Sequence, residues 1–187
     1  MREVFQNELK EVQDRLVEIA GDVTNVMKNA TVAFTTSDVT VADQAIASAD
    51  AISEKALTLD ELVIRILARQ SPVARDLRIL VSALRMSASL ERMGALASHI
   101  AQIARFRFPG SAIPEALKPV FEEMGKLDVE LAKKITKLLA NPDVDVARAI
   151  QAEDERVDEL HRGVFETVLS DSWKENAMFT VDVTLAS

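Results

Sequence analysis

Apolar and polar residues alternate along this chain with the period of long amphipathic helices. From Phe5 to Ala33, apolar residues recur in steps of three and four, which places them on one face of a helix. The pattern predicts a first helix of about 30 residues, which rises 1.5 Å per residue. The polar stretch TTSDVTVAD interrupts it, and Ser37 or Asp38 is a candidate N-cap for a second helix that extends to about Gln70.

Pro72 predicts a tight corner after the second helix, because the residue before a proline avoids the helical conformation. A third helix then extends to about Arg107. Beyond it, the stretch FPGSAIPE contains two prolines and a glycine and predicts a linker over residues 109–115. The linker divides the chain into a first repeat, residues 1–108, and a second repeat, residues 116–187.

The second repeat shows the same succession of helices. Apolar positions from Leu117 to Leu138 predict a fourth helix, the turn NPD follows, and a fifth helix precedes a sixth that begins near Trp173. The closing segment MFTVDVTLAS is rich in β-branched residues, but a lone strand after five helices would have no partner, so we expect helix. The predicted fold is all-α: two tandem three-helix-bundle repeats, the second truncated within its third helix.

The apolar seam of the second helix recurs 105 residues later with two ionisable side chains in it. The first copy consists of Ala45, Ala49, Ile52, Ala56, Leu59 and Val63, and the second of Ile150, Asp154, Val157, His161, Val164 and Val168. Asp154 thus replaces Ala49, and His161 replaces Ala56. Because an unpaired charge is costly to bury, ionisable groups in this phase suggest a site.

Composition and charge narrow the range of functions. The chain has 187 residues, of which 48% are hydrophobic, so it is long enough for a substantial core. It has no cysteine, which excludes disulfides, thiolate metal sites and a cysteine nucleophile, and agrees with a reducing cytosol. The net charge of −8 argues against nucleic-acid binding. The N-terminus shows no apolar signal segment, and no apolar run is long enough to cross a bilayer.

The candidate metal ligands are carboxylates. Asp154 and Asp158 lie one helical turn apart, the spacing at which two ligands can reach one divalent cation. An ordinary solvated acidic face is the competing interpretation. Glu91, at a seam edge of the third helix, is a further candidate ligand, although Ala95 stands where a second acid would be needed. One helix alone does not complete a coordination sphere, so ligands from other helices would be required.

An arginine stripe is the candidate partner-binding surface. Arg78, Arg85 and Arg92 are spaced by seven and lie along one line of the third helix. Residues 73–108 contain six basic and two acidic side chains, a local charge of +4 in a chain whose other residues sum to −12. The stripe could bind an acidic protein surface, phosphate groups or anionic lipid headgroups. A solvated face paired with neighbouring acidic helices is the alternative.

No catalytic constellation is evident. The two histidines, His99 and His161, have no serine or glycine-rich context typical of a nucleophilic triad, and the five glycines form no phosphate-binding loop. We therefore predict no catalytic residues and no organic cofactor, and a protein that is not an enzyme.

Two segments resemble the PhoU family of phosphate-transport regulators. The segment QSPVARDLRILVSALRMSASLERMGALASHIAQIA resembles the family's third helix, and EDERVDELHRGVF resembles the second helix of its second repeat. The resemblance, which is to the actinobacterial type, covers nearly the whole chain and lacks only the family's final helix. It implies a duplicated three-helix bundle.

The resemblance also has implications for metal. Family members have paired acidic residues one turn apart in each repeat, and in some these hold multinuclear metal clusters. Matched residue by residue, the second repeat retains Asp154 and Asp158, the first retains Glu91, and Ala49 and Ser53 occupy the other acidic positions of the first repeat. A divalent ion or an iron or zinc cluster at the remaining acidic motif is therefore the only cofactor expectation.

For function, the resemblance implies a cytoplasmic, non-enzymatic adaptor between a phosphate ABC transporter and its sensor histidine kinase. Such an adaptor restrains phosphate uptake and starvation signalling when phosphate is plentiful, acts as a homodimer, and reaches the membrane only through its partners. The alternative is a carboxylate-bridged metal-binding helical-bundle protein, either a metal store or an oxidase. A structural coiled-coil scaffold is a third possibility.

Overall fold

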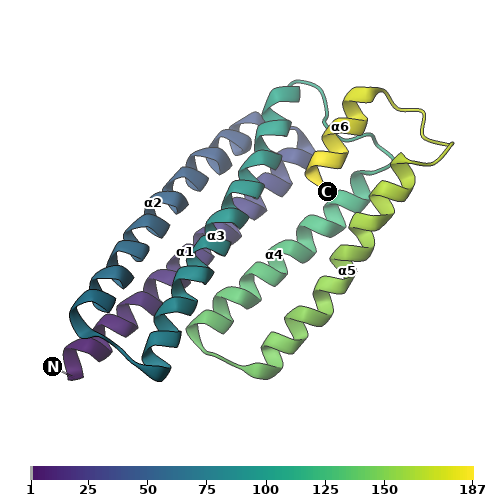
Figure 1. Cartoon of the computed structure of the whole chain (residues 1–187). Coiled ribbons are helices and arrows are strands. Elements are labelled where there is room, and N and C mark those ends of the chain that lie inside the picture. Colours follow the sequence, from purple (N-terminus) through teal and green to yellow (C-terminus); the bar gives the residue numbers. More distant parts are fainter. Residues whose placement is uncertain (1) are drawn as a thin grey trace.

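The computed structural model describes residues 2–187, and within this range every regular element is a helix (Figure 1). The six helices are α1 (Arg2–Thr36), α2 (Val39–Gln70), α3 (Ala74–Arg107), α4 (Lys118–Ala140), α5 (Val144–Val168) and α6 (Ala177–Ala186). The all-α prediction is confirmed. The sixth helix begins at Ala177, later than expected, because Asn176 caps it by accepting a hydrogen bond from the Phe179 N–H.

The first three helices form one bundle in which each packs against the other two, and α4 packs along the outside of α1. Next, α5 packs against α4, and the short α6 contacts both α3 and α5. Among the described residues, α3 and α4 do not pack against each other. The two helices therefore stand on either side of α1 with a space between them.

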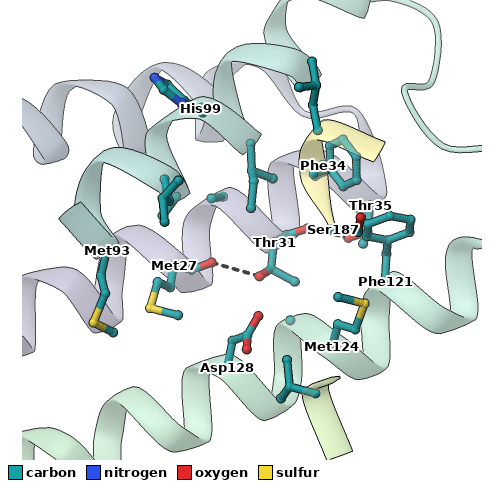
Figure 2. A pocket seen from close by; sticks show the side chains of 18 residues that line it. Met27, Thr31, Phe34, Thr35, Met93, His99, Phe121, Met124, Asp128 and Ser187 are labelled. Carbon is teal, nitrogen blue, oxygen red and sulfur yellow. Dashed lines mark hydrogen bonds between the residues drawn. The ribbon is translucent and has the colours of Figure 1, made fainter. Parts of the chain in front are cut away.

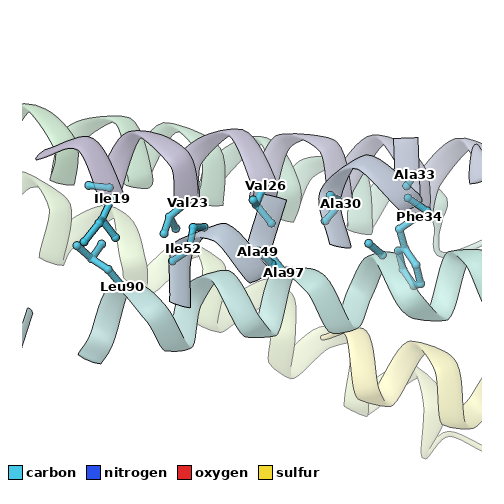
Figure 3. Close-up of a cluster of buried hydrophobic side chains, with 14 of the residues drawn as sticks. Ile19, Val23, Val26, Ala30, Ala33, Phe34, Ala49, Ile52, Leu90 and Ala97 are labelled. Carbon is cyan, nitrogen blue, oxygen red and sulfur yellow. The ribbon is translucent and has the colours of Figure 1, made fainter. Parts of the chain in front are cut away.

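The predicted seam of α2 is buried along its whole length. Ala45, Ala49, Ile52, Ala56, Leu59 and Val63 are all buried against α1 and α3. Figure 3 shows Ile52 and Ala49 among Val23 and Val26 of α1 and Leu90 and Ala97 of α3. The alanines of this seam let the helices approach closely.

The inward face of α3 consists mainly of small residues. The buried residues are Leu80, Ala83, Ser87, Leu90, Gly94, Ala97, Ser98, Ala101 and Ala104, whereas Ile79 is 39% exposed. Small residues occupy the core because the helices lie close together: a Cβ on Gly94 would lie 3.0 Å from Ile52 Cδ1. A second apolar line on α3, which includes Met86, Met93 and Ile100, is therefore only half-buried.

The helix ends follow the expected chemistry. The Asp38 carboxylate accepts hydrogen bonds from the N–H groups of Thr40 and Val41, so Asp38 is the N-cap of α2. Asp143 caps α5 in the same way. At the corner before Pro72, Ser71 adopts a left-handed conformation with φ of 45° and ends α2.

Two contacts fix α4 against α1. Gly125 lies so close to Thr31 that a Cβ on the glycine would be 2.2 Å from Thr31 Cγ2. The rings of Phe34 and Phe121 meet edge to face with centroids 5.3 Å apart. This close crossing connects the two groups of helices.

The short α6 is held by a paired charge. Arg107, at the end of α3, donates from Nε and Nη2 to the two carboxylate oxygens of Asp182, at 2.5 and 2.9 Å. Asp182 is 3% exposed, and the bidentate pairing satisfies its buried charge. A second contact joins α6 to α5, where His161 Nδ1 lies 2.8 Å from the Ser187 carbonyl oxygen.

Candidate functional site

The two ionisable residues of the second seam are exposed, which corrects the expectation that they are buried. The apolar members of that seam are half-buried or buried, but Asp154 and His161 lie at the surface. The reason is that α5 packs only against α4 and the short α6 within the described chain, whereas α2 has two long neighbours. The periodicity of apolar residues identified the inward face of α5 but overestimated how far that face is buried.

The predicted metal ligands do not converge. Asp154 and Asp158 are exposed on α5, and Glu91 is half-buried on α3. Within residues 2–187, no three histidine, aspartate or glutamate side chains lie close enough together to hold one metal ion. These residues therefore do not form a closed coordination sphere, and metal binding at Asp154 and Asp158 stays a prediction.

The most perturbed carboxyl group is one that the sequence did not single out. Asp128 is half-buried on α4, and its burial, together with the negative charge of Asp154, raises its pKa to about 6. The ion pairs that α4 forms, through Lys118, Glu123, Glu130, Lys133 and Lys134, do not include Asp128. The signal that could have found it is its spacing, seven residues after the buried Phe121 on the inward face of α4.

Asp128 borders a cavity of about 380 Å³ in the space between α3 and α4 (Figure 2). Residues of α1 line it together with residues from α3, α4, α5 and the end of α6. Its wall is largely apolar: Met27, Phe34, Met93, Ile100, Phe121 and Met124. Figure 2 shows the Asp128 carboxylate near Thr31 and Met124, toward the open centre of this ring of side chains.

The arginine stripe is exposed. Arg78, Arg85 and Arg92 lie at the surface of α3, and none of them forms an ion pair within residues 2–187. Other arginines of α3 do find partners, such as Arg105, which lies 3.3 Å from Asp43. The next position of the same seven-residue spacing is His99, which borders the cavity. The stripe and the cavity therefore meet along one side of α3.

These features define a class of protein: a duplicated bundle of three helices with an apolar groove between its halves and an exposed basic stripe. None of the described helices combines the length and the apolar character that a bilayer crossing requires. The family model described as "PhoU domain" matches residues 16–104 and again residues 121–186. The chain belongs to the PhoU family.

Named relatives and solved structures agree with this assignment to the PhoU family. The chain is 39% identical over 187 residues to the "Phosphate-specific transport system accessory protein PhoU homolog 2" of Mycobacterium tuberculosis, covering all of this chain and 88% of that protein. It is 37% identical to the PhoU homolog 1 of Mycobacterium leprae, over 99% of this chain and 83% of that protein.

The fold resembles the crystal structure of PhoU from Pseudomonas aeruginosa. The TM-score is 0.87 at 25% identity, and the match covers 97% of this chain and 88% of that chain. The PhoU structure from Streptococcus pneumoniae gives 0.84 at 21% identity, over 97% of this chain and 86% of that chain, which supports the fold alone.

Proposed function

We propose that this protein is an accessory protein of a phosphate-specific transport system, and that it restrains phosphate uptake and starvation signalling when phosphate is plentiful. The observation that carries the proposal is the match to the PhoU domain in both halves of the chain, joined to relatives named as accessory proteins of such systems.

In this proposal the protein works by binding and not by catalysis. It stands in the cytoplasm between the cytoplasmic components of a phosphate ABC transporter and a sensor histidine kinase. Long helices packed into a bundle give fixed surfaces on which two partners can be held at once. The exposed arginines of the stripe, which form no ion pair within residues 2–187, supply a binding surface for an acidic partner, because arginine keeps its charge and forms bidentate contacts with carboxylates.

The test is the expression of phosphate-uptake genes in a strain that lacks the gene for this protein. At high phosphate, the proposal predicts that these genes are derepressed, and that the wild-type gene restores repression. Normal repression in the deletion strain would exclude the proposed role.

Elemental analysis of the purified protein distinguishes the proposed regulator from the alternative, a metal store or an oxidase. Stoichiometric redox metal that is lost in Asp154→Ala would favour it. No arrangement of the described residues favours it at present, since three ligands do not meet anywhere in that range.

A further inference from the structure

A strip of exposed apolar side chains follows the outer side of the contact between α2 and α3. On α2, Leu57 is 62% exposed and Ile64 is 59% exposed, and on α3 the side chains of Leu77 and Val81 are exposed as well. None of these four residues, which we call the apolar strip, lines the cavity beside α4. Large apolar side chains that gather on one face are typical of a surface that another molecule covers.

The register of the two helices brings the strip together. The helices α2 and α3 lie side by side, and because a short corner joins them they are antiparallel (Figure 1). Ile52 of α2 is level with Gly94 of α3, since a Cβ on Gly94 would lie 3.0 Å from Ile52 Cδ1. Counted equally from this pair towards the corner, Ile64 is level with Ser82, which adjoins Val81. The strip therefore spans both helices near that corner.

A carboxylate oxygen without a partner lies within the strip. Asp60 comes three residues after Leu57 and four before Ile64, so it shares their side of α2. The residue is half-buried, and its Oδ1 is buried with no hydrogen-bond partner in the part of the chain that the structure describes. Because such an oxygen is costly to bury, a cation or donor supplied by another molecule would stabilise it.

The α3 side of the strip carries the opposite charge. Val81 comes three residues after Arg78 and four before Arg85, so the arginine stripe borders the strip along α3. The stripe is exposed and forms no ion pair within residues 2–187. An anionic bilayer would complement the stripe and repel Asp60, whereas one helix can carry acidic groups on one edge and a cation on the other. The two charges therefore favour a helix over a membrane.

We propose that the apolar strip binds an amphipathic helix of another protein, whose apolar face covers the strip and whose lysine or arginine pairs with Asp60. The acidic edge of the same helix lies along the arginine stripe. The apolar face supplies affinity, and the two charged sides fix the orientation of the helix. The inference rests on the proposed function, from which it takes the acidic partner of the stripe, and it gives the binding element of that partner a shape and a charge pattern.

A designed peptide is the probe, and its binding to the full chain is measured independently of any phosphate phenotype. The peptide is a helix of about 18 residues, or about five turns, with a leucine seam, glutamates along one edge and one central lysine on the other. The control peptide has norleucine in place of this lysine. Because the chain has no cysteine, Ser53→Cys can carry a single fluorophore on the same side of α2, one turn before Leu57.

We expect the fluorophore at residue 53 to respond to the lysine peptide, while one on Ser172→Cys, in the loop before α6, does not. Asp60→Asn should weaken binding of the lysine peptide at least tenfold and leave the norleucine peptide unaffected, because the two changes remove the same contact. Ile64→Ser should weaken binding of both peptides at least tenfold, since both use the apolar strip.

Two matched controls lie on the other half of the chain. Asp145→Asn removes an exposed charge at the start of α5, and Leu169→Ser removes an apolar side chain that is exposed at its end. Neither should change the affinity for either peptide.

Four results would overturn the proposal. Two concern the peptides: no response of the fluorophore at residue 53, or equal affinity of the wild-type protein for the lysine and norleucine peptides. Two identify another occupant: vesicles of phosphatidylglycerol that bind the protein and are displaced by the peptide, or a dimer, measured by analytical ultracentrifugation, that the peptide dissociates. Normal repression in the deletion strain would exclude the proposed function alone, because the peptide measurements do not use it.

Discussion

At the scale of single residues, Asp128 makes the stability of the fold depend on pH. Its pKa is raised from the ordinary value of 3.8 to about 6, mainly by burial and further by Asp154. The folded protein therefore favours the protonated carboxyl group, and this contribution to stability is present below pH 4 and is lost as the pH rises through 6.

Asp128→Asn should therefore stabilise the protein at pH 8 by about 1–2 kcal/mol, a value reduced from the full shift because the group is partly solvated. Near pH 4 the two proteins should be equally stable, since asparagine resembles the protonated acid. Urea unfolding at both pH values measures the difference. A variant that is less stable than the wild type at pH 8 would contradict this account of Asp128.

Two glycines give a second prediction at this scale. Gly125→Ala introduces a Cβ that would lie 2.2 Å from Thr31 Cγ2. The Thr31 side chain cannot easily move aside, because it is β-branched and its Oγ1 donates a hydrogen bond to the Met27 carbonyl oxygen. The higher helix propensity of alanine offsets part of this clash, so we expect the free energy of unfolding to fall by about 1–2 kcal/mol.

The matched variant is Gly163→Ala on α5, where nothing lies within 4 Å of the new Cβ. Helix propensity then acts alone and should stabilise the protein by up to about 1 kcal/mol. Thermal melts of the two variants should shift in opposite directions. A melting temperature of Gly125→Ala above that of the wild type would contradict the close crossing of α1 and α4 at this position.

At the scale of helices, α6 depends on one charged pair. It has few contacts, and the bidentate pair between Arg107 and Asp182 joins it to α3. Asp182→Asn leaves Arg107 without its partner, so we expect the amide hydrogens of α6 to exchange at least tenfold faster while those of α1 and α2 keep their protection. Hydrogen exchange followed by mass spectrometry measures both.

The control for that prediction is Asp43→Asn. Its partner is Arg105, and both side chains of this pair are more than half exposed, so its loss should leave exchange unchanged. Unchanged exchange of α6 in Asp182→Asn would show that apolar packing alone holds this helix.

The sequence pattern predicts helices more reliably than it predicts burial. The seam of α2 was predicted and is buried in full, because the two long helices α1 and α3 pack against it. The same spacing in α5 placed Asp154 and His161 inside, and both are exposed, since burial depends on neighbours that periodicity does not report. On α3, the large apolar Ile79 lies at the surface, whereas the closely packed core contains the small residues Ser87 and Gly94.

The candidate site was harder to predict for the same reason. Arg78, Arg85 and Arg92 were identified by spacing alone, since exposed charges on one helix need no tertiary information. The groove is built from five helices and includes Asp128 of α4 and Met27 of α1, residues 101 positions apart. No local pattern joins such residues, because the packing of α4 on α1 brings them together.

At the scale of the whole molecule, we propose that one chain holds a transporter and a kinase together. In that proposal the stripe on α3 is part of one partner surface, and the charge of its exposed side chains can be reversed without disturbing the core. Replacing Arg78, Arg85 and Arg92 by glutamate should leave the fold intact and weaken binding to an acidic partner.

Co-isolation of the sensor kinase with an affinity-tagged phosphate transporter tests this claim most directly. In cells grown at high phosphate, we predict that the kinase is recovered with the transporter when this protein is present, is lost when its gene is deleted, and is recovered at a level reduced at least tenfold with the triple glutamate variant. Recovery of the same amount of kinase in the presence and absence of this protein would contradict the adaptor role.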